Sequence, residues 1–197
     1  LERAGIVFMF APTMHPAMRH VGPVRREIAI PTVMNLVGPL ANPARAGRQV
    51  IGVADPVRLE LIAGALQSLG TTHSLVVHGE PGLDEISPLG TTAVIELRDG
   101  TLTRWTLDPA SYGMPRASRE DLATGEPAEN AAMVEEILAG RGTAGAQAAV
   151  LLNAAAALYV SGVSATFEAS LARATESLSS GAGADALRRL RAAAPRH

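Results

Sequence analysis

Cysteine and lysine are both absent from the 197-residue chain, and all of its 17 basic residues are therefore arginines. Without cysteine the chain can form no disulfide framework and no thiolate nucleophile, so a reducing cytoplasm is compatible and is the expected compartment. Without lysine it cannot form a Schiff base, use a lysine as general base, or place the P-loop lysine on bound phosphates.

Aromatic residues are also scarce, at 3%, while hydrophobic residues make up 47% of the chain and the formal net charge is −2. This balance is typical of one globular domain, or of one domain and a fraction, and favours neither a disordered tail nor a nucleic-acid partner. No apolar run approaches the length of a membrane span, and the short run at 4–11 follows Glu2 and Arg3 without a cleavage-site context. We therefore expect no membrane partner.

The first half of the chain alternates predicted strands and helices. Strands are expected at 5–11, 49–54 and 74–78, each a short apolar run. Between the last two, Asp55 and Pro56 predict a helix N-cap followed by proline at the first helical position. This alternation favours an α/β fold with a parallel sheet covered by helices.

The second half is predicted to hold a hairpin and then helices. Residues 92–107 contain two alternating runs joined at an Asp-Gly pair, which is a favoured two-residue turn. Apolar positions at helical spacing predict helices at 127–139, 144–160 and 165–178. The Arg-rich segment that follows them is expected to be short and frayed. The α/β part should therefore end in a helical carboxy-terminal part.

Unusual side chains crowd most densely in residues 11–44, which hold two of the five histidines and an Arg-Arg-Glu triplet. Arginine offers a planar, permanently charged fork that suits a carboxylate or a phosphate, so this segment could line an anion site. The alternative is a solvated helix face on which Arg26 and Glu27 pair, and spacing alone favours it. His15 precedes a proline, and a lone histidine is more often structural than catalytic.

Two adjacent carboxylates, Asp84 and Glu85, follow a predicted strand that ends at Gly79. At the carboxyl end of a parallel strand such a pair suits Mg²⁺, which takes one or two carboxylates together with waters and substrate phosphates. Composition alone favours the alternative, an acidic surface turn. Asn153, within an apolar helix, is expected to be a satisfied core amide. The Gly/Ser-rich run at 179–185 follows no strand, which argues against a phosphate loop.

Five separated segments together resemble one known family. They are HPAMRHVGPVRRE, NLVGPLANP, GEPGLDEISPLGTT, PAENAAMVEEIL and VLLNAAAALYVSG, in that order. No single segment is specific, but their order and spacing closely resemble anthranilate phosphoribosyltransferase over nearly the whole chain, more weakly towards its end. The resemblance implies the parallel-sheet α/β phosphoribosyltransferase architecture of the nucleoside phosphorylase type.

The resemblance also implies a reaction and an aromatic substrate. In the family, the amine of anthranilate attacks C1 of phosphoribosyl pyrophosphate (PRPP), and pyrophosphate leaves, as a step of tryptophan biosynthesis. Anthranilate and PRPP are therefore the implied partners. The residues that match the family's anthranilate-binding positions are Arg25, opposite the substrate carboxylate, and His15, Met18, Gly38 and Pro39.

The family's magnesium-binding acidic pair corresponds to Asp84 and Glu85, so Mg²⁺ is the implied cofactor. The resemblance implies no catalytic base. Anthranilate's aromatic amine is already neutral at pH 7, and neutralisation of the leaving group by the metal, together with orientation, lowers the barrier.

Several parts of the family precede the region that this chain resembles. The glycine-rich GTGGD loop that cradles pyrophosphate, the lysine-containing KHGN segment and most of the small helical domain have no counterpart, and the chain lacks an initiator Met. We expect a carboxy-terminal portion: one partial catalytic α/β domain over 1–197, in which 31–44 resemble the returning part of the helical domain. By itself it should turn over poorly or not at all. The resemblance implies a homodimer for the full-length family, formed largely through the helical domain, and leaves the oligomeric state of this chain open.

Two other functions stay open. A truncated chain that kept the fold would be a non-catalytic binding or interaction module, and an apolar face without its packing partners would favour association. A related nucleoside phosphorylase shares the implied fold. However, the HPAMRHVGPVRRE and NLVGPLANP segments fit the anthranilate enzyme specifically.

Overall fold

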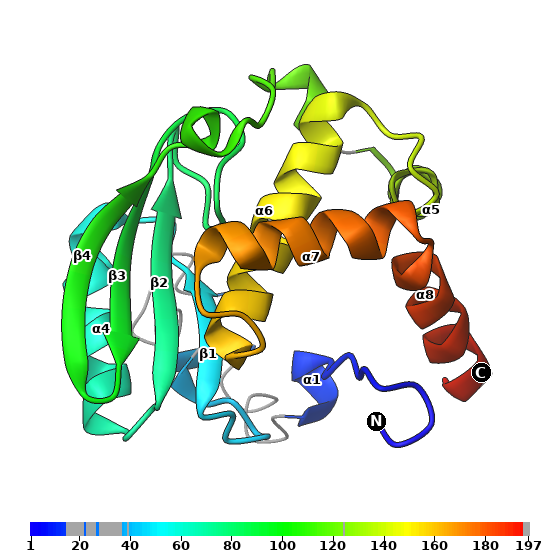
Figure 1. Ribbon diagram of the computed structural model, residues 1–197. Coiled ribbons are helices and arrows are strands. Elements are labelled where there is room, and N and C mark those ends of the chain that lie inside the picture. The colour runs from blue at the N-terminus through cyan, green and yellow to red at the C-terminus, as the bar shows by residue number, and fades with distance from the viewer. Residues whose placement is uncertain (15–21, 23–26, 28–36, 39, 124, 195–197) are drawn as a thin grey trace.

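Figure 1 shows a computed structural model of the chain, which describes residues 1–14, 22, 27, 37–38, 40–123 and 125–194. One sheet has the strand order β1-β2-β3-β4, with β1 at Arg48–Gly52, β2 at His73–Gly79, β3 at Thr92–Arg98 and β4 at Thr101–Leu107. β1 and β2 are parallel, whereas β3 is antiparallel to both β2 and β4. The expected α/β architecture is confirmed, and its described sheet is mixed, because the hairpin extends the parallel pair.

The hairpin forms as the sequence predicts. Asp99 and Gly100 connect β3 to β4 with φ angles of 48° and 79°, the left-handed conformations that a type I′ turn needs. Beside it, β2 lies inside the sheet, and its Leu75, Val76 and Val77 are completely buried. A strand covered on both faces is apolar throughout, which explains why this run does not alternate with polar residues.

One face of the sheet is covered by α4 (Leu59–Ser68), which follows the short 3₁₀ helix η1 (Pro56–Arg58). The predicted N-cap is confirmed, since the Asp55 carboxylate accepts a hydrogen bond from the Val57 N–H at 3.2 Å. The helix and the sheet share a cluster of buried apolar residues: Ile51, Val53, Leu59, Ile62, Ala63, Leu66, Val76, Ile95 and Leu97.

The opposite face is covered by α6 (Ala144–Ser161) and α7 (Phe167–Ser179), as Figure 1 shows. The hydroxyls of Thr143 and Thr166 cap the two helices by accepting hydrogen bonds from backbone N–H groups three residues later. Leu152 of α6 is completely buried in the core cluster on this side, together with residues of β2, β3 and α7. The sheet is thus one layer between α4 and the α6–α7 pair.

By length and composition alone, α6 is apolar enough to cross a membrane, with 18 residues and a mean hydropathy of 1.4. The expectation that no apolar run approaches that length is therefore wrong. The helix buries Leu151, Leu152, Ala155 and Ala156 in the core beside the sheet, and this packing explains its composition.

Two further helices, α5 (Pro127–Leu138) and α8 (Ala182–Ala193), lie beyond α6 and α7 on the side away from the sheet (Figure 1). Two 3₁₀ helices, η2 (Pro109–Tyr112) and η3 (Glu120–Leu122), connect the hairpin to them. The final helix is longer than expected, at 12 residues. It begins directly after Gly181, whose φ of 77° lets the chain turn out of α7, so the Gly/Ser-rich run is partly helical.

The strand predicted at 5–11 is wrong. Residues 6–10 have no regular secondary structure, and the helix α1 (Ala11–Met14) follows them. Phe8 and Phe10 are 77% and 56% exposed. A strand needs a neighbour for its backbone hydrogen bonds, and none of the four described strands pairs with this segment.

Candidate functional site

The acidic pair lies in a loop at the carboxyl ends of the two parallel strands. β1 ends at Gly52, β2 ends at Gly79, and the loop at 80–87 follows β2. Asp84 and Glu85 are both exposed there. Ligands of open α/β sheets bind at this edge, so the carboxylates are accessible where a substrate is expected.

Two glycines let this acidic loop lie directly on the strand ends. A Cβ on Gly52 would come within 1.5 Å of the Asp84 carbonyl oxygen, and a Cβ on Gly79 within 2.6 Å of the Glu85 carbonyl oxygen. Gly79 also closes the loop, because its N–H donates to the Leu83 carbonyl at 2.9 Å and its carbonyl accepts from the Leu83 N–H at 2.7 Å. The backbone of the acidic pair is therefore fixed against both strands.

Helix α6 holds the acidic loop through Asn153. Its Oδ1 accepts a hydrogen bond from the Ile86 N–H at 2.9 Å, and its Nδ2 donates to the Ile86 carbonyl at 2.9 Å. The same Nδ2 donates to the Ala149 carbonyl at 2.9 Å within the helix. The prediction of a satisfied amide is confirmed, and its partner is the residue that directly follows the acidic pair.

The end of the acidic loop is buried and hydrogen-bonded. The Ser87 N–H donates to Thr92 Oγ1 at 3.0 Å, and the Ser87 hydroxyl donates to the Glu80 carbonyl. The Leu89 N–H in turn donates to the Ser87 hydroxyl oxygen at 3.0 Å. These bonds connect the two ends of the loop and leave Asp84 and Glu85 exposed between them.

The charges of the loop suit a divalent cation. Partial desolvation of the Glu85 carboxyl raises its pKa above the usual value of 4.5, and the negative charge of the neighbouring Asp84 carboxylate raises the pKa further. A bound cation would remove this repulsion. The described part of the chain holds no cluster of three or more potential metal ligands. A pair of carboxylates fits Mg²⁺, which completes its octahedral shell with waters and phosphate oxygens.

The structure describes one of the five residues expected to contact anthranilate. His15, Met18, Arg25 and Pro39 lie outside the described residues. Gly38 is described and exposed, its carbonyl accepts a hydrogen bond from the Ala41 N–H at 3.2 Å, and a Cβ on it would meet no atom within 4 Å. Their role in substrate binding stays a prediction.

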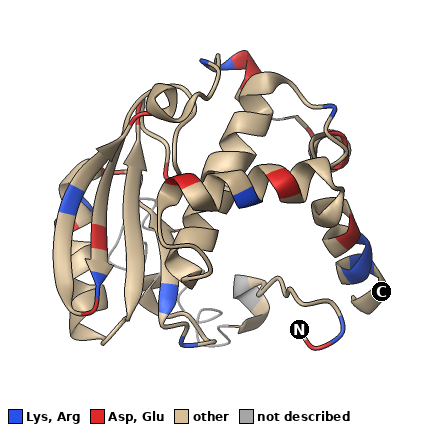
Figure 2. Cartoon of the chain, in the orientation of Figure 1, with Lys and Arg blue, Asp and Glu red and all other residues tan. Residues whose placement is uncertain are grey.

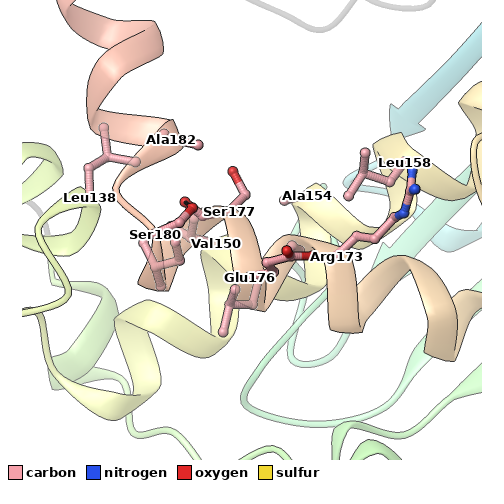
Figure 3. A pocket seen from close by; sticks show the side chains of 13 residues that line it. Leu138, Val150, Ala154, Leu158, Arg173, Glu176, Ser177, Ser180 and Ala182 are labelled. Carbon is pink, nitrogen blue, oxygen red and sulfur yellow. Dashed lines mark hydrogen bonds between the residues drawn. The ribbon is translucent and has the colours of Figure 1, made fainter.

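A hollow of about 570 Å³ lies elsewhere, among α6, α7 and the start of α8 (Figure 3). Val150, Ala154 and Leu158 of α6 line it, and Leu138 of α5 reaches it from the other side. No residue of the acidic loop contributes to its lining. Glu176 of α7 is the single carboxylate in its lining, and the hollow is separate from the candidate metal site.

The chain is similar to known proteins over nearly its whole length. Residues 1–184 match the model of the glycosyl transferase family, α/β domain. The chain belongs to this family. It is 49% identical over 191 residues to the anthranilate phosphoribosyltransferase of Roseiflexus sp. (strain RS-1), covering 96% of this chain and 56% of that protein. It is 44% identical to that of Geobacillus kaustophilus, covering 98% and 57%. The chain thus spans a little over half the length of these relatives.

Solved structures within the glycosyl transferase family have the same fold. The anthranilate phosphoribosyltransferase of Thermus thermophilus matches with a TM-score of 0.89 and 43% identity, over 97% of this chain and 56% of that one. The Saccharomyces cerevisiae enzyme in complex with PRPP and Mg matches with a TM-score of 0.77 and 30% identity, over 90% and 50%. The yeast complex with 4-fluoroanthranilate matches with a TM-score of 0.82 and 30% identity, over 94% of this chain and 53% of that one.

Asn153 gives the first prediction for this glycosyl transferase chain. Asn153→Ala removes both bonds to Ile86, so the acidic loop should loosen and the Mg²⁺ dissociation constant should rise about tenfold or more. The helix itself should persist, because alanine favours it. Calorimetric Mg²⁺ titration measures the first effect and circular dichroism the second. Gln147→Ala is the matched control, since Gln147 of α6 bonds the Gly140 and Gly142 carbonyls instead. Equal losses in both variants would contradict this role.

The raised pKa of Glu85 gives a prediction about pH. The folded state binds the Glu85 proton more tightly than the unfolded state, so this contribution to stability is fully present below pH 4.5 and is lost as pH rises through the raised pKa. Glu85→Gln should remove this loss of stability at rising pH. The free energy of unfolding of the variant, compared with that of the parent, should therefore be higher at neutral pH than in acid. Urea unfolding with chelator across this range measures the difference. Glu176→Gln, at an exposed position of α7, is the control. Parallel pH profiles for Glu85→Gln and the parent would contradict the account.

Proposed function

We propose that this chain carries the magnesium-binding and anthranilate-binding part of an anthranilate phosphoribosyltransferase. The reaction transfers phosphoribosyl from PRPP to the amine of anthranilate, giving N-(5-phosphoribosyl)anthranilate and pyrophosphate in tryptophan biosynthesis. One observation carries the proposal: Asp84 and Glu85 are held at the carboxyl ends of β1 and β2 by Gly52 and Asn153. The relatives that bear this name, and the yeast complexes with PRPP and Mg and with 4-fluoroanthranilate, support it.

Each part of the site has one task in this proposal. Asp84 and Glu85 hold Mg²⁺, and when bound the metal offsets the negative charge that develops on the leaving pyrophosphate. Gly52 and Asn153 hold the acidic backbone in place, which lowers the entropic cost of orienting PRPP. The chain needs no base for the first step, because the attacking aromatic amine is neutral at pH 7.

The amino-terminal segment binds the aromatic substrate in this proposal. Arg25 pairs with the anthranilate carboxylate, for which a guanidinium is the natural partner. His15 and Met18 form one wall around the ring, and Gly38 and Pro39 form the other. The protein works in the cytoplasm. The isolated chain is expected to bind its ligands more readily than it turns them over.

Anthranilate's own fluorescence tests the proposal. Titration of anthranilate with the chain should give a saturable change in the parent and about a tenfold weaker one in Arg25→Ala, since a charged hydrogen bond is lost. Arg116→Ala removes an exposed arginine and is the control. Adding PRPP and Mg²⁺ to the same samples then reports turnover. Equal anthranilate affinity in Arg25→Ala and the parent would rule out the assigned contact.

A second candidate, a non-catalytic interaction module, is favoured by the exposed apolar side chains before α1. Ile6 and Val7 are about half exposed, and Phe8 and Phe10 are exposed further. Contiguous apolar surface of this kind marks association sites. Retained affinity for Mg²⁺ or anthranilate would argue against this candidate. Self-association of a chain that binds neither Mg²⁺ nor anthranilate would support it.

A further inference from the structure

A row of basic side chains crosses the sheet at the end of β2 opposite to the acidic loop. Arg48, His73 and Arg98 are register partners on β1, β2 and β3. Register partners point to the same face with their Cβ atoms about 5 Å apart. Here it is the α6 face, since the Arg48 guanidinium donates to the Val160 carbonyl at 2.6 Å and the His73 ring lies edge-on to Tyr159 with centroids 5.1 Å apart.

This basic row borders a cavity of about 330 Å³. Its lining comes from the ends of three strands, the residue before β2, the hairpin turn, the end of α6 and the segment after α6. These residues are Arg48, Thr72, His73, Arg98, Asp99, Tyr159, Gly162, Val163, Ser164 and Ala165. A space of this size admits a small ligand. Figure 2 shows basic positions at the matching ends of β1 and β3. Arg48 and Arg98 flank His73 on the two neighbouring strands, so an anion beside the row would be attracted by both guanidinium groups.

The buried acid beneath the row is already engaged by the protein. Glu96 Oε1 lies 2.9 Å from His73 Nε2 and accepts a hydrogen bond from the Tyr159 hydroxyl at 2.9 Å. Glu96 Oε2 accepts from the Trp105 indole N–H at 3.1 Å. Both carboxylate oxygens therefore have partners. Among the described residues, the two arginines of the row are left without a carboxylate of their own on this face.

The arginines have donors to spare. Within the described part of the chain, Arg98 forms no ion pair, in contrast to Arg104 on the next strand, whose guanidinium lies 2.6 Å from Glu60. Arg48 has one nitrogen on the α6 carbonyl and further N–H groups beside the cavity. The opposing charge in the lining is Asp99, at the hairpin turn. Removing the negative charge of Asp99 should raise the affinity of the cavity for an anion.

We propose that this cavity is a binding site for a phosphate group, free or carried by a small monoester, held between the guanidinium groups of Arg48 and Arg98. The hydroxyls of Thr72 and Ser164 line the same space and can donate hydrogen bonds to it. Two guanidinium forks that border one cavity suit a tetrahedral oxyanion, which can accept paired hydrogen bonds from each. The site lies apart from the acidic loop and does not depend on the proposed function.

Trp105 reports on this site, because it is the single tryptophan of the chain and shares Glu96 with two residues of the lining. Inorganic phosphate and phenyl phosphate are titrated against its fluorescence with a chelator present and chloride at matched ionic strength, and calorimetry repeats each titration. Parent protein should give a saturable signal with phosphate and none with chloride. Tighter binding of phenyl phosphate would identify a monoester site, and equal or tighter binding of inorganic phosphate a free-phosphate site.

Two substitutions should act in opposite directions. Arg98→Gln, at an exposed residue, should raise the phosphate dissociation constant about tenfold. Asp99→Asn should lower it, and asparagine tolerates the φ of 48° at this turn. Arg116→Gln should have no effect. The double variant Asp84→Asn and Glu85→Gln should also bind phosphate as the parent does, which separates this site from the proposed magnesium site.

Three results would overturn the proposal, and two of them concern the cavity itself. One is the absence of saturable phosphate binding by both fluorescence and calorimetry in the parent. The other is an Arg98→Gln protein that binds phosphate with the parent's affinity. Loss of phosphate binding in the acidic-loop double variant would likewise assign the signal to that loop and not to this cavity.

Discussion

Gly52→Ala is expected to lower the affinity of the chain for Mg²⁺ by about tenfold or more while leaving most of the sheet folded. The new Cβ would lie 1.5 Å from the Asp84 carbonyl oxygen. Because both atoms are fixed to backbone, no rotation of a side chain can relieve this contact. The acidic loop must therefore move off the end of β1, and the carboxylates of Asp84 and Glu85 move with it. Calorimetric Mg²⁺ titration measures the loss, and far-ultraviolet circular dichroism shows whether the fold persists.

Gly64→Ala is the matched control for this substitution. Gly64 lies inside α4, and a Cβ on it would meet no atom within 4 Å. Alanine in a helix interior is favoured over glycine by about 1 kcal/mol, so this variant should be at least as stable as the parent and should bind Mg²⁺ equally well. Parent-like Mg²⁺ affinity in Gly52→Ala would show that the position of the loop on β1 does not matter for the metal.

Leu152→Ala is expected to lower the free energy of unfolding by about 2–5 kcal/mol, a large share of the total for a domain of this kind. Leu152 is 0% exposed and lies where α6 meets the sheet, so its truncation leaves a cavity among side chains that cannot fully collapse. Urea-induced unfolding measures the change.

Val150→Ala tests whether the loss of stability in Leu152→Ala comes from the burial of Leu152. Val150 is on the same helix but 37% exposed, and alanine has the better helix propensity. The free energy of unfolding of this control should fall far less than that of Leu152→Ala. Similar losses in the two variants would mean that α6 does not pack on the sheet as described.

Local signals account for the parts of the fold that the sequence predicts well. The Asp-Gly pair determines the turn at Asp99 because few other pairs adopt two left-handed conformations in succession. Asp55 and Pro56 determine the start of a helix in the same way. The strand predicted at 5–11 was wrong because apolarity alone does not supply a neighbouring strand. The last helix is longer than the sequence predicts, because the glycine-rich run before it is partly helical and only Gly181 of that run has a left-handed backbone conformation.

The acidic pair lies where the sequence predicts it, in the loop at the carboxyl end of a parallel strand. Its role in binding a metal stays a prediction. What fixes the acidic pair could not be read from the sequence, since Asn153 is 67 residues from Ile86. A glycine at a strand end does indicate close backbone approach, so Gly52 carried a usable signal. The contact that Trp105 and Tyr159 share with Glu96 could not be read from the sequence either, because it forms only when β3, β4 and α6 come together.

The most direct test of the central claim is calorimetric titration of Mg²⁺, with and without PRPP, into the parent and into the double variant Asp84→Asn and Glu85→Gln. We predict that the parent binds Mg²⁺, that PRPP tightens this binding because phosphate oxygens complete the metal's shell, and that the double variant shows no detectable Mg²⁺ binding in either condition. Parent-like Mg²⁺ binding in the double variant, or a parent that fails to bind Mg²⁺ even with PRPP present, would contradict the assignment of this loop as the metal site of a phosphoribosyltransferase.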